Sequence, residues 1–115
     1  MRNDKENVIV EKSFRFELQV IQYCELLEEN KKFIISRQLL RSGTSIGANV
    51  RESQNAESKP DFIHKIKLAA KEADETEYWL LLYKNSPSYP FEEKLLTDVR
   101  ELIKILSKII STSKS

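Results

Sequence analysis

Apolar residues recur three or four positions apart in four successive segments of the chain, which is the spacing that places side chains on one face of an α-helix. The segments have similar lengths and are joined by short connections, an arrangement typical of an antiparallel bundle. We therefore predict an all-α fold, an antiparallel up-down-up-down four-helix bundle, in a single domain over residues 1–115. The helices are expected at residues 11–29, 33–57, 60–84 and 91–110.

The two ends of the chain and one internal segment lack this helical pattern. Residues 1–10 hold few apolar anchors and are expected to fray, whereas the polar segment 111–115 is expected to form a disordered tail. Residues 85–90 contain Pro87 and Pro90, and they form the clearest predicted loop. This loop is expected to make the last turn of the bundle.

Two predicted helices carry more apolar surface than a single core contact needs. In helix 11–29 one stripe faces the expected core, and a second stripe lies on the opposite side. Helix 60–84 likewise has apolar residues outside its inner stripe. Exposed apolar surface of this extent is uncommon on monomers, so it favours a homo-oligomer. The residues outside the inner stripes are Phe14, Leu18, Ile21, Leu68, Trp79 and Leu82.

Helix 33–57 carries Gly43 and Gly47 in its interior, where each glycine costs about 1 kcal/mol relative to alanine. Close approach of a neighbouring helix is the usual compensation. We expect both glycines to be packing residues, with Gly43 facing the alanines of helix 60–84 and Gly47 at the edge of the same contact.

Asn49 falls on the inner stripe of helix 33–57, where its amide needs hydrogen-bond partners. The candidates are Ser42, Ser53, Thr76 and Glu77. Asn49 is interpreted either as a structural residue in a buried polar pair that fixes helix register or as part of a ligand site.

The charge of the chain is nearly balanced, with 19 Lys and Arg against 18 Asp and Glu, so any basic site must be local. Arg37, Arg41 and Arg51 lie on the outer side of helix 33–57, spread over roughly 20 Å. They are interpreted either as a solvated face with local Arg–Glu pairs or as contacts for the phosphates of RNA or DNA.

Catalytic and metal-binding motifs are missing from the sequence. Cys24 and His64 are the only residues of their types, which leaves no disulfide pair and no Cys/His zinc set. There is no glycine-rich phosphate loop and no nucleophile motif. We expect no enzyme activity, no catalytic residue, no metal and no cofactor, with Cys24 as a core residue. The charged N-terminal segment has no long apolar run, so we expect a cytoplasmic protein that does not enter membranes.

Two motifs carry a resemblance to a known family. The segment RQLLRSGTSIGANVRES at residues 37–53, with its S-I-G-A-N-x-x-E motif, is followed at 71–82 by KEADETEYWLLL, which contains E-T-E-Y-W-L. Over residues 12–110 the chain resembles the bacterial four-helix-bundle family called S23 ribosomal protein or 23S rRNA intervening-sequence protein.

This resemblance implies a four-helix bundle assembled as a ring-like homopentamer without known enzymatic activity. The chain is also similar to the accessory protein of diversity-generating retroelements, a strongly basic pentamer that binds nucleic acid, although its own charge is near neutral. Two functions follow as hypotheses. One is a homopentameric scaffold for an unidentified protein partner; the other is weak electrostatic binding of RNA or DNA by the oligomer.

Overall fold

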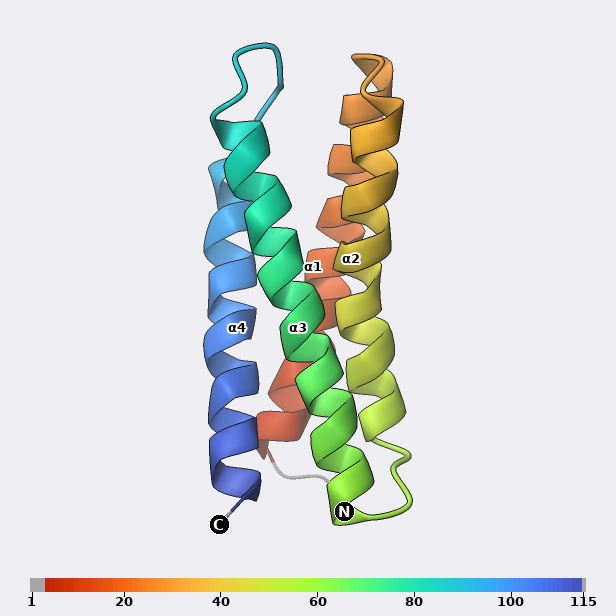
Figure 1. Cartoon of the computed structure of the whole chain (residues 1–115), viewed down its shortest axis with the longest axis vertical. Helices are drawn as coiled ribbons and strands as arrows, with labels where there is room; N and C mark the ends of the chain where they lie inside the picture. The colour runs from red at the N-terminus through yellow and green to blue at the C-terminus, as the bar shows by residue number, and fades with distance from the viewer. Residues whose placement is uncertain (1–3, 115) are drawn as a thin grey trace.

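Four helices lie side by side along the molecule in the computed structural model, which describes the backbone of residues 4–114 and the side chains of residues 8–114 (Figure 1). The described part measures 46 × 20 × 19 Å along its principal axes, so its length is that of one helix. In chain order the helices are α1 (Asp4–Glu29), α2 (Phe33–Ser53), α3 (Lys59–Lys84) and α4 (Glu93–Ser113).

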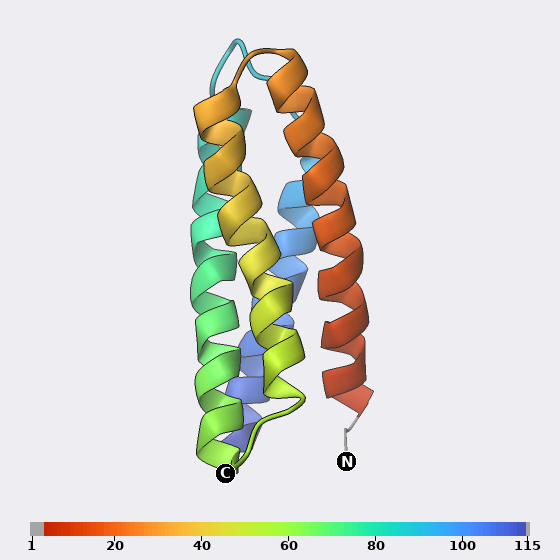
Figure 2. The same ribbon diagram turned by 90° about the vertical axis from the view of Figure 1, so that its right-hand side faces the viewer.

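Each helix packs on the helices that precede and follow it, and α4 closes the bundle against α1. The pairs α1/α3 and α2/α4 lie diagonally across the bundle. Figures 1 and 2 show successive helices running in opposite directions, with α1 and α2 side by side in the second view. The predicted all-α up-down-up-down bundle is thus confirmed.

Several helix ends differ from the sequence-based prediction, three of them by three residues or more. Helix α1 begins at Asp4 instead of residue 11, and its first turns are anchored because Ile9 is fully buried. Helix α2 ends at Ser53 instead of residue 57, since the polar Gln54 and Asn55 turn the chain toward α3. Helix α4 continues to Ser113, so residues 111–113 are helical instead of disordered. The predictions for residues 1–3 and 115 lie outside the described part of the chain.

The connections follow from their local chemistry. Lys31, between α1 and α2, adopts a left-handed backbone with φ 63°, which allows a turn of only three residues. Ser58 caps α3, because its hydroxyl accepts a hydrogen bond from the Asp61 N–H at 3.2 Å, and Pro60 occupies the first turn.

Two tyrosines tie the end of the bundle near the 85–92 loop to its core. The buried Tyr23 donates its hydroxyl hydrogen bond to the carbonyl of Pro90 at 2.7 Å, and the buried Tyr83 donates to the carbonyl of Ile35 at 2.9 Å. Burial raises the pKa of both phenols, so both hydroxyls stay protonated donors across the physiological range. Around them Cys24 is buried, as predicted, and the pKa of its thiol is raised mainly by burial.

The two glycines of α2 face α1, not α3. A Cβ added at Gly43 would lie 3.0 Å from a methyl carbon of Val20, and one added at Gly47 would overlap the carboxylate of Glu17. The predicted close approach is present, but the predicted neighbour was wrong. Sequence spacing places both glycines on one side of α2, yet it does not say which of two adjacent helices that side meets.

The contact between α2 and α3 contains a buried polar pair instead. The hydroxyls of Ser42 and Thr76 are 2.9 Å apart, and Thr76 also donates to the carbonyl of Glu72. Asn49, predicted to make such a pair, is only half-buried and donates to the Ser45 carbonyl of its own helix at 2.9 Å. The predicted partners of Asn49 were therefore wrong, because its side chain lies at the rim of the contact.

The packing of Gly43 against Val20 predicts the effect of a larger residue at this position. Gly43→Leu removes a poor helix former but overpacks a buried contact, and we expect a net loss of about 2 kcal/mol in the free energy of unfolding, measured in urea. Gln38→Leu, at an exposed position of the same helix, is the control and should stay within about 0.5 kcal/mol of the wild type. An unchanged stability for Gly43→Leu would contradict the close packing.

Candidate interaction surfaces

Exposed apolar side chains lie on the outside of α1 and α2, and we call this surface the α1/α2 face. Phe14, Leu18 and Ile21 follow one another at helical spacing along α1, and Phe14 is 63% exposed. Leu40 is exposed on α2, one turn before Thr44, a residue that shares a groove with Phe14. The predicted second stripe of α1 is therefore confirmed as solvent-exposed in the protomer.

The groove between α1 and α2 adjoins this face at Phe14 and has a volume of about 440 Å³. Its lining is mostly apolar and includes Gly47, and its charged groups are two glutamates and one arginine. Each of these residues belongs to α1 or α2, which lie next to each other in Figure 2. The groove is lined by Val10, Glu11, Ser13, Phe14, Glu17, Thr44, Gly47, Ala48, Val50 and Arg51.

Glu17 reaches from α1 across the groove to the backbone of α2. Its carboxylate accepts a hydrogen bond from the N–H of Gly47, and the absence of a side chain at Gly47 makes room for it. In an α-helix this N–H also points at the carbonyl four residues earlier, so the carboxylate shares its donor.

Burial raises the pKa of Glu17 from 4.5 to about 7, and the hydrogen bond from Gly47 lowers it only in part. Glu17 forms no ion pair with a described residue, so no cation offsets the cost of burying its charge. It was not among the site residues predicted from the sequence. The feature that distinguishes Glu17 is the glycine opposite it, 30 positions later in the chain.

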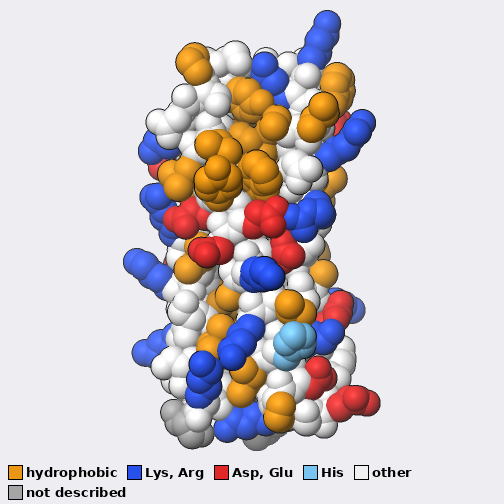
Figure 3. Space-filling model, viewed as in Figure 1, with side chains coloured by type: hydrophobic (Ala, Val, Ile, Leu, Met, Phe, Trp, Pro, Cys, Tyr) orange, Lys and Arg blue, Asp and Glu red, His pale blue; other side chains and the backbone are white. Residues whose placement is uncertain are grey.

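A second apolar surface, the α3 patch, lies on the far side of α2. Tyr78 and Leu82 are exposed one turn apart on α3, beside the half-buried Trp79, and Tyr78 is 57% exposed. Ile34, in the first turn of α2, is 72% exposed. Figure 3 shows hydrophobic side chains gathered over the upper part of this face, above a belt of acidic and basic side chains. Of the predicted α3 residues, Leu82 is exposed, whereas Leu68 is half-buried.

Arg41 is bound by two carboxylates of α3. It forms an ion pair with Glu72 at 3.2 Å and a second, closer pair with Glu75. The Arg41 hydrogen bond lowers the pKa of Glu75, and the indole N–H of Trp79, 3.0 Å from the same carboxylate, adds to this effect. The positive charge of Arg41 is therefore largely balanced within the protomer.

Arg37 and Arg51 differ from Arg41 in their ion pairing within the described residues. Arg37 and Arg51 are exposed and form no ion pair with the side chains that the structure describes. Arg51 lies at the groove on the α1 side of α2, whereas Arg41 turns to the α3 side. Arg41 and Arg51 thus turn to opposite sides of α2.

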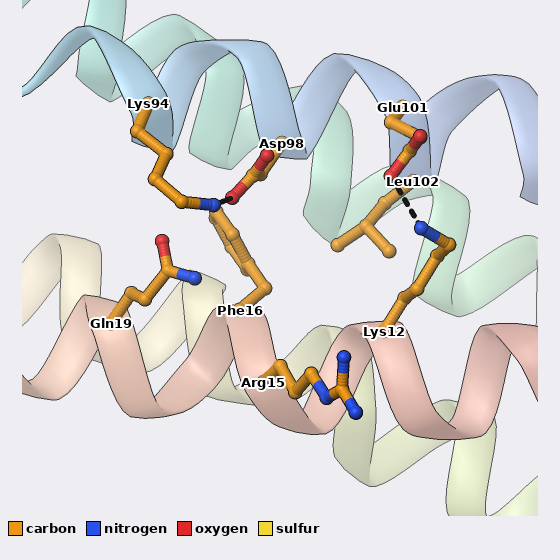
Figure 4. Close-up of a pocket in the computed structure, with 8 residues that line it drawn as sticks. All are labelled: Lys12, Arg15, Phe16, Gln19, Lys94, Asp98, Glu101 and Leu102. Carbon is orange, nitrogen blue, oxygen red and sulfur yellow. Dashed lines mark hydrogen bonds and ion pairs between the residues drawn. The ribbon is translucent and has the colours of Figure 1, made fainter.

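A smaller groove of about 140 Å³ lies between α1 and α4 (Figure 4). Two ion pairs occupy it, Lys94 with Asp98 at 2.6 Å and Lys12 with Glu101 at 3.0 Å. Arg15, on its rim, is paired with Glu11. Because its cations and carboxylates are matched, this groove offers no charge to a ligand.

Two structural features, a metal-ligand cluster and a membrane-spanning helix, would point to metal or membrane chemistry in the described residues. Within them, no three His, Cys, Asp or Glu side chains are grouped as a metal site would require. No helix among them is long and apolar enough to cross a membrane.

The fold and its surfaces define an all-α four-helix bundle with two separate apolar surfaces. Within this class, the chain belongs to the 23S rRNA-intervening sequence protein family, whose model matches residues 5–111. Its structure is similar to that of a protein of unknown function from the S23 ribosomal protein family of Bacteroides thetaiotaomicron, with a TM-score of 0.86 and 45% sequence identity over 93% of this chain and 98% of the other. No curated protein matches the chain.

The Arg41 pairs predict a measurable link between α2 and α3. Arg41→Gln leaves Glu72 and Glu75 without their cation and should lower the free energy of unfolding by about 0.5–1 kcal/mol at low salt, the upper range for exposed pairs. The difference in free energy of unfolding between the wild type and the variant should be smaller in 1 M salt, because salt screens the ion pairs that only the wild type forms. Arg37→Gln is the matched control, and an equal loss for both variants would argue against a specific role for Arg41.

Proposed function

We propose that this protein is a non-enzymatic scaffold that works as a closed homo-oligomeric ring, in which the α1/α2 face of one copy packs on the α3 patch of the next. One observation carries the proposal: a protomer with two separate exposed apolar surfaces on different helices. Large exposed apolar patches usually mark binding surfaces, and two of them call for two contacts per protomer.

The position of the two surfaces favours a ring over a simple dimer. A twofold dimer buries the same patch on both copies and would leave the second surface of each protomer in water. A head-to-tail contact between unlike surfaces buries both, and it closes into a ring when the rotation between copies divides a full turn. The belt of charged side chains next to the α3 patch supplies a polar rim, as is usual around an apolar interface core (Figure 3).

We take the number of copies from the family resemblance, which implies a homopentamer. A ring of five repeats each surface five times, so it can present several equal sites to one partner and bind it through effective concentration. We propose that this partner is a protein.

A mixing experiment tests the head-to-tail contact. Leu18→Glu places a charge on the α1/α2 face, and Leu82→Glu places one on the α3 patch; both positions are exposed, so the protomers should still fold. By light scattering after size exclusion, the wild type should have a mass of about 68 kDa, five times the 13.5 kDa chain, and each variant that of a monomer.

An equal mixture of the two variants should give a heterodimer of about 27 kDa, twice the chain mass, because one intact surface of each remains complementary. Ser107→Glu, at an exposed position on α4, a helix that contributes to neither surface, is the control and should remain at the wild-type mass. Dimers of either variant alone would indicate like-with-like contacts, and a monomeric wild type at micromolar concentration would refute the ring.

Nucleic-acid binding by the oligomer, through Arg37, Arg41 and Arg51, is the alternative, and it has weaker support. The charge of Arg41 is engaged by two carboxylates and the overall balance is near neutral, whereas phosphate contacts need available cations. We expect no retardation of RNA or DNA in gels at about 50 mM salt, where such contacts are stronger than at physiological salt. Retardation that the triple change to Gln abolishes, with the oligomer intact, would support the alternative.

A further inference from the structure

The contact between Glu17 and Gly47 joins a side-chain carboxyl of α1 to the backbone of α2. A carboxyl group crosses an apolar groove and rests on the backbone of the middle of a helix, far from the free N–H groups of a helix start. It fits there because residue 47 has no side chain. The groove is open to water along the α1/α2 face, so the carboxyl can leave this position without unfolding the bundle.

We propose that Glu17 is a protonation switch for the α1/α2 face: the neutral carboxyl seats against Gly47 and keeps the groove apolar, whereas the ionised carboxylate draws water into it and weakens the seating of a second copy. This inference rests on the proposed function for its effect on assembly. The effect on the α1–α2 contact is a property of the protomer alone.

No charged side chain that lines the groove is paired with Glu17, so the charge at this position depends on whether Glu17 itself is protonated. Those that line the groove with it are Glu11 on α1 and Arg51 on α2, and α3 and α4 contribute no side chain to the groove. Glu11 is already paired with Arg15, on the same helix. Arg51 lies one turn beyond Gly47, is exposed, and forms no ion pair with Glu17.

The raised pKa of Glu17 sets the sign of the pH dependence of stability. The pKa of Glu17 is about 7 in the folded protein and 4.5 in a solvated chain, so folding favours the protonated form. Its contribution to stability is fully present below pH 4.5 and is lost as the pH rises toward and through 7. Around neutral pH a small change in proton concentration therefore changes the charge of the face.

The experiment compares the wild type with Glu17→Gln from pH 5.5 to 8.5, using the melting temperature and the mass in solution. The wild type should melt about 5 °C lower at pH 8.5 than at pH 5.5 and shift toward smaller species at low micromolar concentration. Glu17→Gln, a neutral side chain of the same shape, should lose most of both changes. Glu11→Gln, a neighbour on the same rim, is the control and should retain them.

A second variant removes the seat and keeps the carboxyl. In Gly47→Ala the new Cβ takes the place of the Glu17 oxygens, which can swing into the open groove because they end a flexible side chain. Followed by the NMR shift of its carboxyl carbon, Glu17 should titrate near pH 7 in the wild type and move toward 4.5 in Gly47→Ala.

The possible results separate this inference from the proposed function. An ordinary titration of Glu17 in the wild type, or the same pH dependence in Glu17→Gln, would overturn the switch. A wild type that stays monomeric at every pH would overturn the ring and the effect on assembly. In that case, a melting temperature that falls with rising pH in the wild type but not in Glu17→Gln would still support the switch within the protomer. If the oligomer kept a constant mass across the pH range while the melting temperature fell in this way, the coupling between the switch and assembly would be overturned.

Discussion

The contact between α1 and α2 sets the arrangement of the other elements. Because Gly43 and Gly47 have no side chains, α1 lies close to α2, with Val20 against one glycine and Glu17 against the other. This close approach of α1 to α2 fixes the rotation of α1 about its own axis. Phe16, Val20 and Tyr23 then fill the core, and the apolar residues on the opposite side of α1 face solvent.

Helix α2 meets its two neighbours with different chemistry. Toward α1 it presents glycines and a groove in which the Glu17 carboxyl rests on its backbone, whereas toward α3 it presents hydroxyls and Arg41. The α3 side is locked by matched polar groups, since a buried hydroxyl pair and ion pairs each need a partner in register. The α1 side depends on shape and on the protonation of Glu17. The two surfaces proposed for assembly lie beyond these two contacts, one on each side of α2.

The fold could be predicted from the sequence because helical periodicity extends through all four segments and the loops are short. The second stripe of α1 could be predicted for the same reason.

The neighbours of Gly43 and Asn49 could not be predicted. The spacing of residues shows which side of a helix they occupy, but it does not show which neighbouring helix packs on that side. Glu17 was missed because an isolated glutamate among apolar residues is common at the edge of a stripe, and only the fold reveals the glycine opposite it. The helical ends at Asp4 and Ser113 were missed because weakly apolar turns gain stability from packing that periodicity does not report.

Cross-linking between protomers tests the head-to-tail ring most directly. Cysteines replace Leu18 on the α1/α2 face and Leu82 on the α3 patch, in a chain whose buried Cys24 is changed to Ala, and the thiols are oxidised at micromolar concentration. A head-to-tail ring predicts a ladder of covalent multimers that stops at the pentamer for the double variant, and no covalent dimer for either single cysteine. Efficient dimers from a single-cysteine variant, or no multimers from the double variant, would contradict it.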